Sequence, residues 1–275
     1  MGGCTENGAF HGATGASSGH LDPQAVIDPG AALGPGCSVG PFAVIGKGVV
    51  MGAGNVVHTH AVILGPTALG DDNEVHPFAV LGGAPQDLRH RGEPTRLEIG
   101  SRNVFREHVT VSRGTVHGGG STSLGDDNLL MAGCHVAHDC RLGSHVVMAN
   151  QATLAGHATV DDHAVFGGFV GVGPFVRIGE SAMLAAGAMI ERDVPPFCIA
   201  AGDRARLSGV NRVGLGRRGF SADARAQIKR VFRLLKERGT PLAEIVEALG
   251  AEPGVTPEAM RMVEFLRLAR RGVLR

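Results

Sequence analysis

Apolar residues recur at every sixth position over most of this 275-residue chain. The first unbroken run has ten members, which are Ile27, Leu33, Val39, Ile45, Met51, Val57, Ile63, Leu69, Val75 and Leu81. The second has twelve, which are Leu124, Leu130, Val136, Leu142, Met148, Leu154, Val160, Phe166, Val172, Ile178, Leu184 and Ile190. A period of six matches neither the turn of a helix, about 3.6 residues, nor the alternation of a strand. It predicts a short strand and a turn, repeated, with one aliphatic side chain per repeat pointing inward.

Many of these positions are followed by glycine, for example Gly34, Gly40, Gly125 and Gly143, which suits tight corners. Stacked repeats of this kind build a parallel β-helix in which each coil completes the core of its neighbour. The hexapeptide form is a left-handed prism with three repeats per coil, an exception to the right-handed crossover rule. The fold is therefore expected to be mainly β, a left-handed parallel β-helix.

Two interruptions of the period predict loops that leave the prism. Between Leu81 and Ile99 the phase is kept, but Asp87 and Glu93 fall at inward positions, so a loop is expected near residues 83–97. Between Val111 and Leu124 the phase slips by one around three glycines, which predicts a second loop near 114–123. Loops on a regular scaffold often carry function.

The repeat ends after Val194, where two prolines follow, and helical spacing begins. Three amphipathic segments follow, with Ser221, Thr240 and Thr256 as expected N-caps and Pro241 and Pro257 in the first turns. The expected organisation is a polar, disordered leader over residues 1–19, the β-helix over 20–194, and a linker with a small three-helix α-helical domain over 195–275.

Composition and charge narrow the function. The chain has 43 Gly and 11 Phe but no Trp or Tyr, which fits a fold of many corners rather than an aromatic core. Residues 1–203 carry 10 Lys and Arg against 19 Asp and Glu, a balance of −9, whereas residues 204–275 carry 16 against 7, a balance of +9. The basic end could contact nucleic acid, a membrane surface or an acidic carrier, or could be an ordinary solvated surface.

Cysteine and hydropathy patterns indicate the compartment. The five cysteines are odd in number and form no CxxC pair, which favours a reducing compartment without structural zinc. No apolar run approaches the roughly 20 residues of a membrane span, and residues 1–19 lack the features of a signal peptide. A cytoplasmic protein without stable membrane insertion is expected.

The stretch GCHVAHDC, residues 133–140, holds the candidate chemistry. Because Val136 is an inward repeat position, His135 and His138 are expected on the outer surface of the prism. Leu154 follows Val136 by 18 residues, or one coil of three repeats, so His157 is expected in the same region one coil further along.

Three interpretations of these histidines remain open. One imidazole could be a general base for a hydroxyl nucleophile, with Asp139 fixing its tautomer. Three histidines could instead hold zinc, or they could be solvated, stacked side chains. Ser112, Cys134 and Cys140 are available nucleophiles, but no motif activates them.

Several segments together resemble the acyl-carrier-protein-dependent UDP-N-acetylglucosamine 3-O-acyltransferases, which start lipid A synthesis. They are GGAPQDLRHRGEPTRLEIG, FREHVTVSRGT, DDNLLMAGCHVAHDC, ANQATLAGHATVDD, DVPPFCIAAGD, GVNRVGLGRRGFS and the ending RGVLR. The resemblance covers residues 20–275. The sister N-acyltransferase of the same pathway shares the prism but not this loop and C-terminal domain.

The resemblance implies a homotrimer with active sites in clefts between adjacent prisms, and a reaction without metal or cofactor. A 3-hydroxyacyl chain would pass from acyl carrier protein to the sugar 3-hydroxyl. His138 would be the general base, Asp139 would orient it, and the backbone N–H of Gly156 would stabilise the oxyanion.

The same resemblance implies the binding residues. Gln86, Asp87 and Arg89 in the first loop, with His135 and His157, would bind the substrate. Asn211 and Arg217 would lie at the uracil and phosphate end, and Ala186 would form the floor of the acyl pocket. The basic C-terminal domain would receive the acidic carrier protein, and no nucleic acid is implied.

The sequence departs from the family pattern at three sites. Arg89 replaces the usual lysine and keeps its charge in a forked shape. Gly173-Pro174 replaces a His-Gln pair, and Pro174 lacks an N–H donor. Ala186 replaces a frequent glycine, which would favour a shorter acyl chain.

These departures keep other functions in view. One is a paralogous acyltransferase for a 3-amino or different UDP-sugar. Another is a metal-dependent hydratase of the same fold, and a third is a non-catalytic scaffold trimer.

Overall fold

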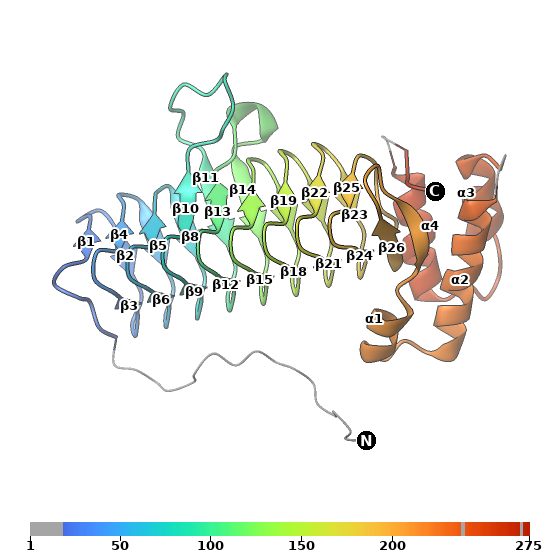
Figure 1. Ribbon diagram of the computed structural model, residues 1–275, viewed down its shortest axis with the longest axis horizontal. Helices are drawn as coiled ribbons and strands as arrows, with labels where there is room; N and C mark the ends of the chain where they lie inside the picture. The colour runs from blue at the N-terminus through green and yellow to red at the C-terminus, as the bar shows by residue number, and fades with distance from the viewer. Residues whose placement is uncertain (1–18, 238–239, 270–271) are drawn as a thin grey trace.

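The computed structural model describes residues 19–237, 240–269 and 272–275. The predicted leader therefore lies outside the described residues except for Gly19. The described chain forms a long three-sided prism with a helical part at its C-terminal end (Figure 1). This architecture confirms the predicted mainly β fold with parallel coils, followed by helices.

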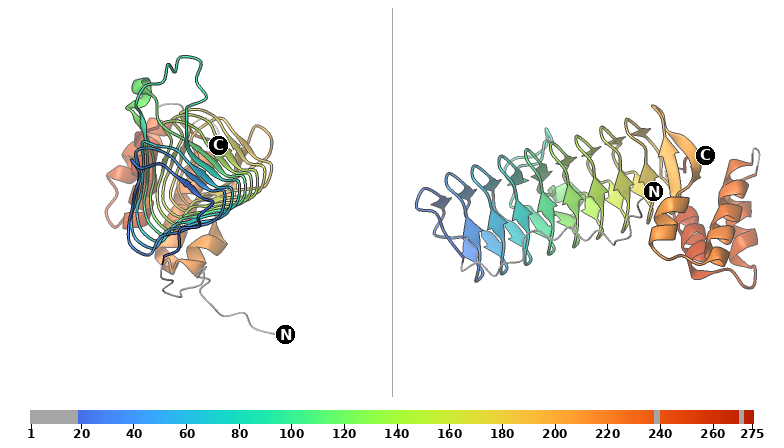
Figure 2. Two further views of the ribbon diagram at one scale, coloured as in Figure 1. Left: turned by 90° about the vertical axis from the view of Figure 1, so that its left-hand side faces the viewer. Right: turned by 60° about the horizontal axis from the view of Figure 1, so that its bottom comes forward.

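Three parallel sheets form the sides of the prism, and Figure 2 shows the triangular section. Face 1 has nine strands: β1 (Val26–Ile27), β4 (Val44–Ile45), β7 (Val62–Ile63), β10 (Val80–Gly83), β13 (Thr110–Ser112), β16 (His135–Val136), β19 (Thr153–Leu154), β22 (Gly171–Val172) and β25 (Met189–Ile190). Face 2 has eight: β2 (Ala32–Leu33), β5 (Val49–Met51), β8 (Thr67–Leu69), β11 (Arg96–Ile99), β14 (Ser121–Leu124), β17 (Arg141–Leu142), β20 (Thr159–Val160) and β23 (Arg177–Ile178).

Face 3 contains ten strands and continues beyond the prolines. Eight belong to the coils: β3 (Ser38–Val39), β6 (Val56–Val57), β9 (Glu74–Val75), β12 (Val104–Phe105), β15 (Leu129–Leu130), β18 (Val147–Met148), β21 (Val165–Phe166) and β24 (Met183–Leu184). Then β26 (Cys198–Ala201) pairs in parallel with β24, and β27 (Arg206–Val210) pairs antiparallel with β26. The expected linker after residue 194 therefore contains two strands, because the prolines lie in a corner and remove no ladder donor.

The six-residue period explains the packing. A typical strand has two residues, of which the first faces outward and the second inward, as in β16, where Val136 is buried. Val136 pairs with Val111 on one side and with Leu154 on the other. Each inward side chain thus sits between those of the adjacent coils, and the column forms one continuous hydrophobic core.

Both predicted loops leave the same edge of the prism. The turns that join a face 1 strand to the next face 2 strand form what we call the 1–2 corner. Residues 84–95 leave it between β10 and β11, and residues 113–120 leave it between β13 and β14, with a short 3-10 helix at Val116–Gly118. Figure 1 shows the two loops side by side at the top of the prism.

The described residues of the C-terminal part form four helices: α1 (Arg212–Arg217), α2 (Ala222–Lys236), α3 (Leu242–Gly250) and α4 (Pro257–Arg267). The last three were predicted, and α1 is additional. Ser221 and Thr256 cap α2 and α4 as expected, but the predicted Thr240 cap is wrong, because Pro241 occupies the N-cap of α3 and makes no side-chain bond there. Within the described ranges, no helix combines the length and apolar composition that a bilayer crossing needs.

Candidate active site

The candidate histidines lie at the 1–2 corner, directly beyond the two loops. His138 and Asp139 form the turn between β16 and β17, and Gly156 and His157 form the same turn one coil later. Asp139, His157 and then Phe175 all have φ near +60°, with values of 61°, 63° and 63°. The repeated corner geometry therefore stacks residues that are 18 positions apart in sequence.

His138 and Asp139 form a pair whose geometry suits general base catalysis. His138 Nδ1 lies 2.8 Å from Asp139 Oδ2. The Asp139 carboxylate is buried and also accepts hydrogen bonds from Thr115, from its N–H at 2.8 Å and its hydroxyl at 2.7 Å. A carboxylate can accept a bond only from a protonated Nδ1, so the neutral imidazole presents Nε2 as its acceptor.

His157 supports His138 from the next coil. The two rings meet edge to face with centroids 5.3 Å apart, and His157 stacks on Phe175 at 4.3 Å. His157 Nε2 lies 3.7 Å from Asp139 Oδ2. Burial lowers the pKa of His157 below its usual 6.5, which favours the neutral ring.

Gly156 provides the space that the His138 ring occupies. A Cβ at Gly156 would lie 2.6 Å from His138 Cε1, closer than real contacts allow. The backbone itself tolerates a side chain here, since His138 and Pro174 occupy the same corner position in the coils before and after. Among the described residues, the Gly156 N–H has no hydrogen-bond partner, so it is free to donate to a ligand.

We expect Gly156→Ala to lower kcat about 10- to 100-fold, because an added methyl must displace the His138 ring and misplacement by about 1 Å can cost that much. Steady-state kinetics would measure the loss. Gly46→Ala is the control at the first position of the 1–2 corner that follows β4, where an added Cβ meets no atom closer than Ile63 O at 3.3 Å. Equal losses in both variants would contradict this role for Gly156.

His135 faces the same pocket from β16. Its Nδ1 lies 2.7 Å from Thr110 Oγ1 on the adjacent strand β13, which fixes the ring. Burial lowers the pKa of His135, and the charge of His138 adds to this effect. His135 is therefore a neutral hydrogen-bonding group at neutral pH.

The first loop brings an ion pair to the same region. Arg89 donates from Nη2 to Asp87 Oδ2 at 2.8 Å and from Nε to both carboxylate oxygens. Hydrogen bonds from Arg89 hold the pKa of Asp87 well below its usual range, and His138 contributes in the same direction. Asp87 is therefore an ionised acceptor, and the adjacent Gln86 lines the pocket that contains His138.

A pocket of about 640 Å³ extends along face 1 from His138. It is lined by Gln86, His135, Ala137, His138, Thr153, Leu154, Ala155, Gly156, Gly171, Val172, Gly173, Met189, Ile190, Glu191 and Asp203. The two histidines lie at one end with Gln86, and most of the other lining residues are apolar, with Thr153, Glu191 and Asp203 as the exceptions. Such a pocket suits a ligand with a polar head and a hydrocarbon tail.

Of the predicted site residues, Gln86, His135, His138 and Gly156 line this pocket, and Asp87, Arg89, Asp139 and His157 lie next to them in the first loop and at the 1–2 corner. Three others lie away from it. Asn211 caps α1 by accepting from Gly214 N–H, and its amide donates to Ser181 O, while Arg217 is exposed on the same helix. In Figure 1, α1 lies on the opposite side of the prism from the loops. Ala186 is exposed between β24 and β25, at the corner between face 3 and face 1.

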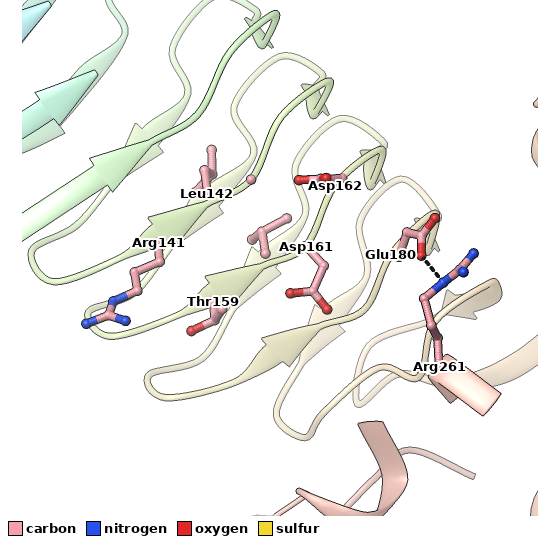
Figure 3. A pocket seen from close by; sticks show the side chains of 9 residues that line it. Arg141, Leu142, Thr159, Asp161, Asp162, Glu180 and Arg261 are labelled. Carbon is pink, nitrogen blue, oxygen red and sulfur yellow. Dashed lines mark hydrogen bonds and ion pairs between the residues drawn. The ribbon is translucent and has the colours of Figure 1, made fainter. Parts of the chain in front are cut away.

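A second pocket of about 480 Å³ lies on face 2, next to α4 (Figure 3). Its lining includes three carboxylates, Asp161, Asp162 and Glu180, the last of which pairs with Arg261. Burial raises the pKa of Asp161. No histidine lines this pocket, so the candidate active site is the one at His138.

The His138 group could also bind a metal by ligand type, since ligand atoms of His138, Asp139 and His157 lie within 4.8 Å of one another. However, a metal would compete with the Thr115 hydroxyl for Asp139 Oδ2. The hydrogen-bonded arrangement therefore favours the base interpretation over the zinc interpretation.

Two half-buried histidines predict how stability depends on pH. The pKa values of His135 and His163 lie below 6.5 in the folded chain because of burial, so the unfolded chain binds protons first as the pH falls. We expect the unfolding temperature to fall from about pH 6.5 downward. Calorimetry should compare the wild type with a double variant that carries His135→Gln and His163→Gln. The unfolding temperature of the double variant should fall less steeply with decreasing pH, and identical slopes would contradict the assignment.

Comparisons with known proteins agree with this geometry. Residues 193–274 match the family model described as Udp N-acetylglucosamine O-acyltransferase, Domain 2, and residues 121–156 match the model Bacterial transferase hexapeptide (six repeats). The chain is 48% identical over 211 residues to an acyl-[acyl-carrier-protein]–UDP-N-acetylglucosamine O-acyltransferase from Halorhodospira halophila, covering 77% of this chain and 82% of that protein.

Solved structures are similar over nearly the whole chain. The UDP-N-acetylglucosamine O-acyltransferase of Moraxella catarrhalis has a TM-score of 0.90 at 35% identity, covering 93% of this chain and 99% of that one. The UDP-N-acetylglucosamine acyltransferase of Bacteroides fragilis has a TM-score of 0.89 at 37% identity, covering 92% and 99%. The similarity includes both the prism and the helices.

Proposed function

The chain belongs to the UDP-N-acetylglucosamine O-acyltransferase family, and from this premise we propose that it transfers an acyl chain from acyl carrier protein to the 3-hydroxyl of UDP-N-acetylglucosamine. This reaction is the first step of lipid A biosynthesis, and a 3-hydroxyacyl chain is the proposed cargo. One observation carries the proposal: His138 is oriented by a buried, doubly anchored Asp139 and lies against Gly156, whose N–H has no partner among the described residues.

His138 acts as the general base. Its Nε2 takes the proton of the sugar 3-hydroxyl while the oxygen attacks the thioester carbonyl. The Gly156 N–H donates to the oxyanion that forms, and the imidazolium, stabilised by Asp139, returns the proton to the leaving thiolate. The proposed reaction forms no covalent intermediate with the protein. The cysteines agree with this, because burial raises the pKa of Cys134 to about 11 and that of Cys140 to about 12, and a protonated thiol is a poor nucleophile.

The sugar nucleotide binds across two copies of the chain in this proposal. Gln86, Asp87 and Arg89 meet the sugar beside His135 and His157. Asn211 and Arg217 lie far from this corner within one chain, so they contribute the uracil and phosphate contacts from a neighbouring prism. Arg217 is the freer of the two, since the Asn211 amide already caps α1 and bonds to Ser181. A homotrimer meets this requirement.

The acyl chain occupies the apolar part of the face 1 pocket. Gly173 lines it where the family carries a polar side chain, and Pro174 offers no N–H. The proposed consequence is a weaker polar contact near the thioester. Ala186 lies at the other edge of face 1. If the acyl tail or a neighbouring prism reaches that corner, the Ala186 methyl group favours shorter acyl chains.

The C-terminal region supplies the carrier contact. Its balance of +9 over residues 204–275 would attract an acidic acyl carrier protein and raise the rate of encounter. A donor of this kind also implies a cytoplasmic setting. No metal or cofactor takes part in the proposed chemistry.

A second candidate is acylation of a 3-amino sugar nucleotide, which Gly173-Pro174 favours because the altered corner changes the polar contacts at the reacting group. Purified protein should be given UDP-N-acetylglucosamine and its 3-amino analogue with acyl-carrier thioesters of several lengths, and the products identified by mass. We expect an ester on the hydroxyl sugar. An amide on the amino sugar alone would reject the O-acyl assignment, and no product with either would reject acyl transfer.

A further inference from the structure

A second histidine cluster lies on the prism, far along the chain from His138. His58 follows β6 and His76 follows β9, so the two residues occupy the same position in successive coils of face 3. Their rings stack with centroids 4.8 Å apart and an interplanar angle of 29°. Glu74 is the outward residue of β9, and its carboxylate points to both rings.

The distances in this cluster suit metal coordination. Glu74 Oε1 lies 2.8 Å from His58 Nε2 and 3.3 Å from His76 Nε2. Two ligand atoms on a tetrahedral Zn²⁺, with bonds of about 2.0–2.1 Å, lie about 3.3 Å apart. All three ligand atoms lie within 4.8 Å of one another, so small rotations of the side chains bring them to one centre.

The surroundings leave the cluster accessible. The side chains of His58, Glu74 and His76 are 37%, 31% and 19% exposed, so an ion can enter from solvent. Arg106 follows in the next coil, but its Nε and Nη2 donate to the Glu107 carboxylate. Glu107 Oε1 also lies 3.6 Å from His76 Nδ1. A carboxylate beside the ring nitrogen that does not bind the metal can orient a metal-bound imidazole, and Glu107 is placed for this role at His76.

We propose that His58, Glu74 and His76 form a binding site for one divalent transition metal ion, with Zn²⁺ the best match to two imidazoles and one carboxylate. Three protein ligands leave a fourth position for water. Because the ligands come from two coils, the bound ion joins those coils and stabilises the N-terminal half of the prism. The acyl-transfer proposal neither requires nor uses this site.

The test is metal binding by the full chain, free of affinity tags and stripped with a chelator. Zn²⁺ affinity and stoichiometry are measured by competition with a chromophoric chelator, and Co²⁺ is added separately to record the visible spectrum of a tetrahedral site. Three variants remove ligands: His58→Ala, Glu74→Gln and His76→Ala. Thermal unfolding with and without Zn²⁺ provides a second measurement.

The control is His145→Ala. His145 stacks on His163 at 4.7 Å, as His58 stacks on His76, but its nearest carboxylate oxygen, on Asp127, is 4.0 Å away. We expect each ligand variant to weaken Zn²⁺ binding by at least about 100-fold. Removing a residue that only orients a metal ligand already costs up to about 100-fold, and removing the ligand itself should cost at least as much. His145→Ala and His138→Ala should keep the binding and the Zn²⁺-dependent rise in unfolding temperature.

Two results would overturn the proposal. One is a wild-type protein that binds no Zn²⁺ or Co²⁺. The other is binding that survives all three ligand variants but disappears in His138→Ala, which would assign the ion to the candidate active site. Circular dichroism of Glu74→Gln, a change that preserves shape, separates loss of the site from loss of the fold.

Discussion

His138→Ala is expected to lower kcat about 100- to 10,000-fold, the range that loss of a general base produces. The alanine variant removes the imidazole that accepts the proton of the sugar hydroxyl, and Asp139 cannot replace it, since it is buried and bonded to Thr115. KM for the sugar nucleotide should change only a few-fold, because proton transfer belongs to the transition state. Steady-state kinetics with saturating acyl-carrier thioester would measure both quantities.

The control for His138→Ala is His145→Ala, a histidine at a different corner that lines neither pocket. It should retain the wild-type kcat. The pH profile offers an independent readout. In the wild type, kcat/KM should fall on the acidic side of its profile, and this fall should be absent from the residual activity of His138→Ala. A His138→Ala enzyme with more than a tenth of the wild-type kcat would remove the base assignment.

The coil geometry could be predicted because it repeats. One inward residue in six fixes which side chains face out, and the 18-residue coil stacks His157 on the corner that holds His138. No tertiary information is needed for this step, since each coil contacts only its neighbours. The proximity of His135, His138 and His157 therefore followed from counting.

The contacts made by the loops could not be predicted in the same way. Thr115 reaches Asp139 from a segment that breaks the period, so its conformation depends on local turns and on three glycines. The extension of face 3 through β26 also escapes prediction, because a proline pair normally ends a sheet, whereas here it lies in a corner. For the His58–Glu74–His76 cluster, the signal was present as two histidines 18 residues apart with a glutamate two residues before the second.

Asp139→Asn is expected to lower kcat about 1,000- to 10,000-fold, the size of loss seen in catalytic triads when the carboxylate that orients the histidine is replaced by an amide. The Thr115 N–H requires an oxygen at the Oδ1 position, so the new amide NH₂ must take the Oδ2 position beside His138 Nδ1. Nδ1 then accepts a hydrogen bond, and the ring proton moves to Nε2. His138 remains in place but can no longer accept the proton of the hydroxyl.

This explanation separates tautomer control from simple support of the fold. Thr115→Val removes the hydroxyl bond to Asp139 Oδ2 but keeps the N–H bond and the carboxylate, so its kcat should fall by no more than about 100-fold, the size of one hydrogen bond to a charged group. Both variants should unfold near the wild-type temperature, measured by circular dichroism. Equal kinetic losses in the two variants, or a folded Asp139→Asn enzyme with wild-type kcat, would mean that the tautomer of His138 does not limit the reaction.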